Sequence, residues 1–370
     1  MRKFLLLPFP ALRFGAWLLP GMVLGVVSSC SSGGERATTL PLPTGHYEGP
    51  ISYQGTDLRV ALDLREVAPG QLEADLHFPE LEGMSFAAAN LRYKEPQLMF
   101  EQPGQASRAA VTAIREGDFL RGVFTLDSIK AEFVWVRRGQ AAPRSYQPQA
   151  WAFQAAGKAQ RLTLLVPADT VSRHPAVALL ADETSAAAAQ ARADLLARQG
   201  FVTVVVPTAK VPEGDSTSIR SVAAVFQALR HQASVDSTRV GLWLRGPGAR
   251  ELVLATGLTQ PAASFVVLEN VAVASGEEAK PFQQVSRLRI PVLALYAAAD
   301  TSLDVRGSTR RLRAAVGSRR GSTVRTFPQA NADFVVPGRV NSEGKWLWPQ
   351  PAPGFAEGLT SWLQQRGPVQ

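Results

Sequence analysis

The sequence predicts two folded regions, an all-β region followed by a mostly parallel α/β sheet with helices on both faces. Two observations predict this order. Between residues 44 and 138, apolar residues alternate with polar ones in short runs, which is the period of strands with one buried face. From residue 151 onward, short apolar runs alternate with helical patterns, which is typical of a parallel sheet with helical crossovers.

The all-β region, residues 44–138, holds seven or eight predicted strands. Alternation is clearest at 58–64 and 72–78, and turn residues such as Pro69-Gly70 separate the runs. Strands at this spacing predict a curled antiparallel sheet or a small barrel. Residues 139–150 contain two prolines and little apolar periodicity, so we expect them to form a linker.

The α/β region, residues 151–370, alternates strand and helix to its end. The helix predicted at 216–231 carries Val222, Phe226 and Leu229 on one face, at the spacing of a buried stripe. The other predicted helices are 185–199, 248–257, 308–316 and 353–365, and the predicted strands are 162–167, 176–180, 201–206, 239–244, 265–268, 291–296 and 323–327.

The N-terminus has the organisation of an export signal. A basic start precedes an apolar stretch at 14–27, which is too short to span a bilayer and suits a signal-peptide core. The stretch ends in Val27-Ser28-Ser29-Cys30, which resembles a bacterial lipobox. We therefore expect residues 1–29 to be removed, Cys30 to be lipidated and residues 30–43 to form a tether. The alternative is an ordinary signal peptide followed by an incidental cysteine.

Acyl chains on Cys30 would hold the protein on a membrane of the bacterial cell envelope without a transmembrane helix. Ser31 favours the outer membrane or periplasm, by resemblance to bacterial sorting rules. With 46% hydrophobic and 19% charged residues, the composition excludes a disordered chain, and a single cysteine excludes a disulfide framework. Without residues 1–29, the net charge falls from +8 to +5, with 36 basic against 31 acidic residues, which does not indicate a nucleic-acid partner.

Four landmarks within residues 155–366 resemble the α/β-hydrolase superfamily, in particular its dienelactone-hydrolase and esterase-like members. They are the runs 175–180, 235–242, 290–300 and 327–331. In the family, the corresponding runs lead to the oxyanion turn, the nucleophile elbow, the catalytic acid and the catalytic histidine. The resemblance implies an α/β-hydrolase fold with its reacting groups outside the carboxyl ends of the strands.

The positions that should carry the reaction are vestigial. The nucleophile position of the elbow holds Gly246, and Pro247, which has no N–H, follows it where an oxyanion donor belongs. Ala332 stands at the histidine position, and none of the four histidines follows Asp300, the acid position. We therefore expect a hydrolase fold without an intact catalytic triad.

Several polar residues leave other interpretations open. Asp182, Arg245, Asp300 and Asp333 are expected near the mouth of the old active site, as candidate ligand-binding residues. Carboxylates there could hold a divalent cation or form an acid/base pair. Alternatively, they are solvated loop acids, with Asp182 and Asp300 capping adjacent helices. No spacing is diagnostic of a metal ligand set, so we expect no metal site and no cofactor.

Two further residues bear on catalysis. Asp304 is a nearby substitute for Asp300, and Ser185 is either a displaced nucleophile or the N-cap of the helix that follows it. A carboxylate at position 182 would also repel a developing oxyanion. No lid segment is predicted, because about twenty residues separate Asn270 from Ile290, so the pocket is expected to be shallow and open.

Trp346 and Trp348 form an aromatic cluster that could stack on a sugar or seal an interface, or could pack the last loop against its own domain. Taken together, the residues predict a membrane-anchored envelope lipoprotein, a pseudoenzyme that binds a ligand or scaffolds an envelope partner. One alternative is an active hydrolase of carboxylic esters or related acyl bonds that uses a non-standard acidic site centred on Asp300. The other is a surface module that binds a glycan or a protein.

Overall fold

The computed structural model describes residues 41–366, apart from 82, 104–108, 156–157, 209–215, 247 and 318–320. The predicted signal peptide, Cys30 and all but the end of the tether lie outside the described residues, and so does Pro247. Residues Leu42–Gln370 belong to one unit. Within the described part of the chain, no helix is long and apolar enough to cross a membrane.

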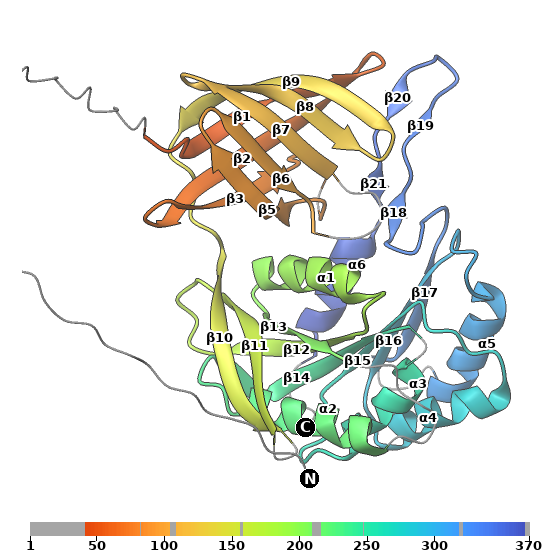
Figure 1. Ribbon diagram of the computed structural model, residues 1–370. Helices are drawn as coiled ribbons and strands as arrows, with labels where there is room; N and C mark the ends of the chain where they lie inside the picture. Colours follow the sequence, from red (N-terminus) through yellow and green to blue (C-terminus); the bar gives the residue numbers. More distant parts are fainter. Residues whose placement is uncertain are drawn as a thin grey trace, which may run out of the picture. The chain divides into compact units, whose positions relative to one another are not determined.

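Sheet A contains nine antiparallel strands in the order β4-β3-β2-β1-β9-β8-β7-β6-β5 (Figure 1). Its strands are β1 Gly45–Tyr53, β2 Thr56–Ala68, β3 Gln71–His77, β4 Phe86–Ala87, β5 Ala89–Lys94, β6 Gln97–Glu101, β7 Ala109–Glu116, β8 Phe119–Leu126 and β9 Ile129–Gly139. A single residue, Ala88, joins β4 at one edge to β5 at the other, so the sheet curls until it is nearly a barrel. Tyr47, Phe100 and Trp135 are buried inside it.

Sheet B contains eight strands in the order β10-β11-β13-β12-β14-β15-β16-β17. The first hairpin is antiparallel, and β12 to β17 pair in parallel. The strands are β10 Tyr146–Ala155, β11 Lys158–Pro167, β12 His174–Ala181, β13 Val202–Pro207, β14 Val235–Arg245, β15 Val266–Glu269, β16 Val292–Ala297 and β17 Thr323–Phe327. The sheet is therefore mostly parallel, as the sequence predicts.

Helices cover both faces of sheet B (Figure 1). They are α1 Ala186–Arg198, α2 Ser216–Arg230, α3 Ala249–Leu252, the 3₁₀ helix η1 Val253–Gly257, α4 Gly276–Arg287, α5 Val305–Val316 and α6 Phe355–Gln364. Helices α1 and α6 pack on one face, and α2, α4 and α5 pack on the other. The predicted fold class, an α/β-hydrolase-like sheet preceded by an all-β sheet, is confirmed.

Several elements differ from the sequence prediction. Sheet A has nine strands, whereas seven or eight were predicted. Strand β10 begins at Tyr146, inside the stretch predicted as a linker, because Trp151 and Phe153 extend a hairpin with β11. The helix predicted at 248–257 tightens into a 3₁₀ helix from Val253. Helix α4 was not predicted, although Ser275 caps it by accepting a hydrogen bond from the Glu278 N–H, as a capping box does.

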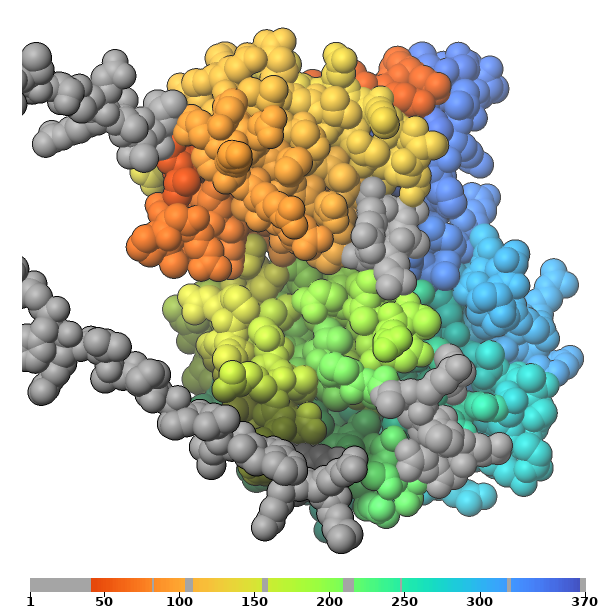
Figure 2. All heavy atoms as spheres, in the orientation of Figure 1, coloured from red at the N-terminus to blue at the C-terminus, as the bar shows by residue number. Residues whose placement is uncertain are grey.

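After sheet B, residues 335–351 form an extension that reaches sheet A. It contains β18 Val335–Val336, β19 Arg339–Val340, β20 Trp346–Leu347 and β21 Gln350–Pro351. Thr56 Oγ1 donates to the Trp346 carbonyl at 2.7 Å, the Tyr53 ring meets Trp346 edge-on at 5.6 Å, and Trp348 is buried in the core of sheet A. In Figure 2 the blue surface of the extension meets the orange surface of the β1–β2 hairpin. Of the readings left open for the two tryptophans, the structure supports an interface between sheet A and the extension.

Candidate functional site

The turn predicted as the nucleophile elbow joins a strand to a short helix, and its central residue has no side chain. Strand β14 ends at Arg245, Gly246 turns the chain with a φ of +79°, and α3 begins at Ala249. Glycine adopts this left-handed conformation without the steric cost that a Cβ brings. A Cβ at position 246 would lie 3.8 Å from Asp182 Oδ2, so a side chain there would face a carboxylate. Pro247, the other vestigial residue of the elbow, lies outside the described residues.

Asp182 closes the turn that leads into α1. Its Oδ1 accepts hydrogen bonds from the Thr184 and Ser185 backbone N–H groups, at 3.1 and 2.9 Å, and from both hydroxyls, at 2.8 and 2.7 Å. Burial acts to raise the pKa of Asp182, but these hydrogen bonds outweigh it and lower the pKa. The carboxylate is thus ionised beside Gly246. Asp182 closes the turn that precedes α1 but does not cap the helix, because the N-cap residue is Ser185.

Ser185 is the N-cap residue of α1 rather than an exposed nucleophile. It is 4% exposed, and its hydroxyl donates to Asp182 Oδ1. All four histidines of the chain are described. His46 and His77 lie on sheet A, His174 begins β12 at the opposite end of the strand from Asp182, and His231 follows α2. No histidine is therefore placed to take a proton from Ser185.

The acid and base positions lie in loops at the carboxyl ends of β16 and β17. Asp300 Oδ1 accepts from the Ser302 N–H at 2.9 Å and from its hydroxyl at 2.6 Å, which closes a turn. The N-cap of α5 is Asp304, which accepts from the Gly307 N–H at 2.9 Å. The prediction that Asp300 caps the adjacent helix is wrong, because the loop continues for four more residues and α5 begins after Asp304. Ala332, at the base position, is held by its carbonyl, which accepts from Asn270 Nδ2 at 2.9 Å.

A buried carboxylate that sequence reasoning missed dominates this edge of the sheet. Glu269, 1% exposed at the end of β15, accepts from Trp243 Nε1 at 2.8 Å, Arg245 Nη1 at 3.0 Å and Arg192 Nη2 at 3.3 Å. The signal was an acid that ends the apolar run 265–268 at the carboxyl end of a predicted strand. The network joins β14, β15 and α1.

Asp333 completes the pairing of these arginines. Its Oδ1 lies 3.2 Å from both terminal nitrogens of Arg245, and its carbonyl accepts from Arg192 Nη2 at 2.8 Å. The Arg192 guanidinium also lies 4.7 Å from the centre of the Phe355 ring. Burial acts to lower the pKa of Arg245, but Glu269 and Asp333 outweigh it and raise the pKa. Arg245 therefore stays charged and serves as an ion-pair partner, not as an acid or base.

The four predicted ligand-binding residues differ in how closely they approach Arg245, and Asp300 interacts with it through its charge without a hydrogen bond. Arg245 and Asp333 are in direct contact, and Asp182 lies beside Gly246. The side chain of Asp300 has its hydrogen bonds to Ser302 instead. Within the described ranges, no three His, Cys, Asp or Glu side chains are grouped so that they could hold a metal ion.

A cavity of about 670 Å³ lies over this edge of the sheet. Arg245, Asp333 and one face of α1 line it on the sheet B side, while sheet A and the extension form the opposite wall. The expected shallow, open pocket is therefore wrong. Sheet A covers the site, although the described chain contains no helical cap after β15. Its lining residues include Met84, Phe86, Leu126, Ile129, Tyr146, Ala187, Ala191, Arg192, Leu195, Arg245, Asn331, Asp333 and Trp346.

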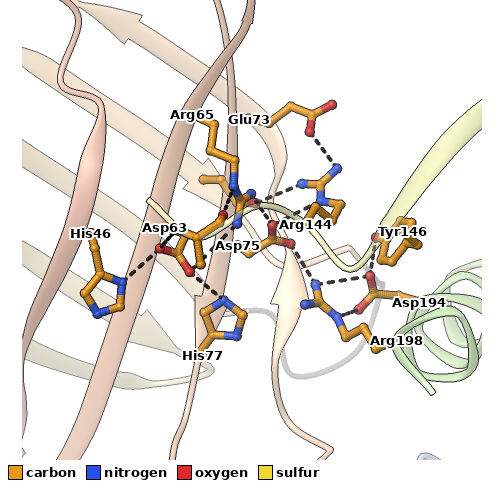
Figure 3. A network of polar contacts seen from close by, with 12 residues as sticks. His46, Asp63, Arg65, Glu73, Asp75, His77, Arg144, Tyr146, Asp194 and Arg198 are labelled. Carbon is orange, nitrogen blue, oxygen red and sulfur yellow. Dashed lines mark hydrogen bonds and ion pairs between the residues drawn. The ribbon is translucent and has the colours of Figure 1, made fainter. Parts of the chain in front are cut away.

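A second polar network fixes sheet A against α1 (Figure 3). Asp75, fully buried on β3, pairs with Arg144 Nε at 3.0 Å, with Arg198 Nη2 at 2.7 Å and with Arg65. Arg198 also pairs with Asp194 at 3.0 Å, and Asp194 accepts from the Tyr146 hydroxyl beside the cavity. Burial acts to raise the pKa of Asp75, but the arginines outweigh it and lower the pKa.

Two histidines on sheet A share one carboxylate of this region. Asp63 lies 2.8 Å from His46 Nδ1 and 3.2 Å from His77 Nε2 (Figure 3). His46 Nε2 also lies 3.0 Å from Glu48. Burial acts to lower the pKa of His46, but the two carboxylates raise it above its usual value. Burial and the nearby Arg198 lower the pKa of His77. The pKa values of the two imidazoles are therefore shifted in opposite directions.

No family model and no curated protein matches this chain. Among solved structures, a putative dienelactone hydrolase from Klebsiella pneumoniae is 17% identical, covers 60% of this chain and 99% of its own, and has a TM-score of 0.43. An esterase domain from Rhodothermus marinus is 15% identical, covers 59% of this chain and 99% of its own, and has a TM-score of 0.43. A putative carboxylesterase from Lactobacillus plantarum is 15% identical, covers 61% of this chain and 100% of its own, and has a TM-score of 0.43.

Proposed function

We propose that this chain is a ligand-binding protein on an α/β-hydrolase fold that has lost acyl-transfer chemistry. The observation that carries the proposal is the elbow itself. The strand, turn and helix that present a nucleophile are in place, but Gly246 supplies none. Ala332 supplies no base at the histidine position, and the histidines of the chain lie elsewhere.

The oxyanion site argues against residual activity. When a serine-hydrolase triad is removed, about 10³–10⁴-fold acceleration over water remains, and it comes from the oxyanion hole and from substrate binding. Here the ionised Asp182 lies beside Gly246, at the place where negative charge would develop. A carboxylate destabilises an oxyanion, so the share of this remainder that an oxyanion hole supplies is lost as well.

The cavity supports binding as the retained role. Its volume of about 670 Å³ falls within the range of small-molecule sites, about 300–1,000 Å³. Apolar side chains from sheet A and α1 form most of its wall, and a few polar groups lie at one end. Such a mixture orients a bound molecule through a few hydrogen bonds and derives most of its affinity from apolar contact.

We also propose that lipidated Cys30 anchors the protein in the bacterial envelope, at the outer membrane or in the periplasm. The lipobox-like run before Cys30 supports this. Expression of the full chain in a bacterium that processes lipoproteins should give a membrane-bound product whose intact mass includes acyl chains. The Cys30→Ala variant should leave the membrane fraction. A Cys30→Ala protein that remains membrane-bound without acyl chains would contradict the anchor.

Ester hydrolysis, the activity named for the solved structures above, is the second candidate. The observation in its favour is Asp300, which keeps a carboxylate at the acid position. The deciding experiment presents short-chain and aryl esters to the chain from Ser31 onward, which contains all described residues. If the unmodified chain hydrolyses the esters no faster than Asp300→Ala and Asp304→Ala do, the result supports the binding role. Turnover that either substitution abolishes would establish the acidic site instead.

A further inference from the structure

The cavity over the vestigial elbow has apolar walls from two parts of the chain. Phe86, Leu126 and Ile129 of sheet A are each less than 10% exposed where they border it. Across from them, α1 contributes the small side chains of Ala187 and Ala191, which leave room between the two walls. Burial of an apolar group in this space contributes about 25 cal/mol per Å² of surface removed from water.

The ionic groups at the polar end are already neutralised by one another. Arg192 and Arg245 share Glu269, and Asp333 accepts from both arginines. A bound anion would have to compete with Asp333 for Arg245, and a bound cation would have to compete with Arg245 for Asp333. Either exchange leaves one buried or half-buried charge without its partner, which is costly in a site shielded from water.

The remaining charged residues of the lining do not change this balance. Asp194 is paired with Arg198 and accepts from Tyr146. Asp127 lies in the exposed turn between β8 and β9, at the rim, where water solvates its carboxylate. Among the described lining residues, each buried or half-buried charged side chain therefore has an ion-pair partner, although Arg192 Nε, on a guanidinium already paired with Glu269, is buried without a hydrogen-bond partner.

Uncharged hydrogen-bonding groups, in contrast, remain available. Asn331 Oδ1 accepts from the Asp333 and Val335 N–H groups, at 3.1 and 3.0 Å, and its Nδ2 makes no hydrogen bond to the described residues. The hydroxyls of Ser85 and Ser128, also in the lining, have no hydrogen-bond partner among those residues either. An amide N–H and hydroxyls of this kind bind alcohol, ester or amide groups well.

We propose that the cavity binds an uncharged amphiphile, a molecule with an apolar body and a neutral hydrogen-bonding head. The inference rests on the proposed binding function and names its ligand class. The apolar body lies between sheet A and α1, and the head lies at the end where Asn331 meets the paired arginines.

The test uses probes with matched chains and the chain from Ser31 onward. Octan-1-ol, octanoate and octylammonium share their apolar body and differ in the charge of the head. Each is titrated at pH 7 against N-phenyl-1-naphthylamine, a neutral dye that fluoresces in apolar sites. We expect octan-1-ol to displace the dye about tenfold more tightly than either ion, a difference of about 1.4 kcal/mol.

Two variants locate the site on α1. Ala191→Trp fills the cavity and should weaken dye binding about tenfold or more. Ala186→Trp, on the same helix but exposed and outside the lining, is the matched control and should bind as the unmodified chain does. Asp333→Asn frees Arg245 from one carboxylate, so it should tighten octanoate binding severalfold and leave octan-1-ol unchanged.

The outcomes separate the ligand class from the binding role. Octanoate or octylammonium binding as tightly as octan-1-ol, with Ala191→Trp still inhibitory, overturns the neutral class and keeps the binding function. Dye binding that is absent, or that Ala191→Trp does not weaken, overturns the cavity as the site. Ester turnover, measured separately, decides whether the protein is a hydrolase.

Discussion

Glu269 and Asp75 are two buried carboxylates surrounded by arginines, but they lie in different parts of the chain. Glu269, 1% exposed, ends β15 beside the empty elbow, where a hydrolase holds its reacting groups. Asp75, 0% exposed, lies on sheet A. Helix α1 contributes to both networks, through Arg192 to Glu269 and through Arg198 to Asp75.

The networks differ in how many arginines depend on each carboxylate. Asp75 meets three arginines, Arg65, Arg144 and Arg198. Each of the three also pairs with a second carboxylate, of Asp63, Glu73 and Asp194 in turn. Glu269 meets two arginines, of which Arg245 also pairs with the Asp333 carboxylate, while Arg192 donates to the Asp333 backbone carbonyl. The comparison teaches that the charged residues at the carboxyl ends of β14 and β15 join neighbouring elements in the same way as the network on sheet A does. Arginine–carboxylate pairing at this edge is sufficiently explained by a structural role.

The largest expected effect is that of Asp75→Asn. The substitution leaves three buried or half-buried arginines without their common carboxylate, so we expect it to lower the free energy of unfolding by about 3–5 kcal/mol. Urea denaturation measures this loss. Glu277→Gln, which breaks an exposed pair with Lys280, is the control and should cost less than about 1 kcal/mol. An equal loss in both variants would refute a structural role for Asp75.

Glu269→Gln should cost less, about 2–3 kcal/mol in the same denaturation experiment. The amide oxygen can still accept from Trp243 Nε1, and Arg245 keeps Asp333 as a partner. The difference in unfolding free energy between the two variants therefore compares a carboxylate that meets three arginines with one that meets two. A loss greater than that of Asp75→Asn would contradict the comparison.

Gly246→Ala tests whether the elbow keeps its geometry after the loss of its nucleophile. A Cβ at a φ of +79° costs about 1–2 kcal/mol of stability, even though no atom blocks it closely. Gly276→Ala, at the start of α4 with open space around it, is the control and should be neutral or slightly stabilising. A Gly246→Ala protein of unchanged stability would show that the turn relaxes out of its left-handed conformation.

The smallest effect is a pH-dependent one at Asp63. Because the folded pKa of His46 is raised, its stabilisation is complete below the unfolded pKa of about 6.5 and is lost as pH rises through the folded value. His46→Asn should therefore cost up to about 1 kcal/mol more at pH 5.5 than at pH 8.5, by urea denaturation.

His77→Asn should show the opposite sign. The folded pKa of His77 is lowered, so His77 destabilises the folded chain as pH falls below about 6.5. Its replacement should make the protein relatively more stable at pH 5.5 than at pH 8.5. Parallel pH profiles for the two variants would show that Asp63 does not couple them as the structure indicates.

Local patterns predicted most elements and the turn at Gly246. Alternation predicted the strands of sheet A, and the spacing around Gly246 predicted the elbow, because both depend on residues close in sequence. Helix α4 was missed, although its Ser275–Glu278 capping box was legible. Glu269 was missed because an acid at the end of an apolar strand was not weighed as a buried group.

The covered cavity was beyond any local pattern. It depends on sheet A packing over the ends of β14 and β17, and contacts such as Arg198 with Asp75 join residues far apart in sequence. Neither residue has neighbours in the sequence that reveal its partner. For the same reason, the sequence did not reveal that Glu269 and Arg192 bond to one another beside Arg245.

Reaction with a fluorophosphonate tests the central claim most directly, because the probe labels any activated serine and needs no knowledge of the substrate. The chain from Ser31 onward is incubated with excess probe and its intact mass is measured, with a serine esterase as the positive control. We predict no adduct, because Gly246 has no hydroxyl. The hydroxyl of Ser185 is buried and donates a hydrogen bond to Asp182. A one-to-one adduct on Ser185 or any other serine would contradict the loss of catalysis.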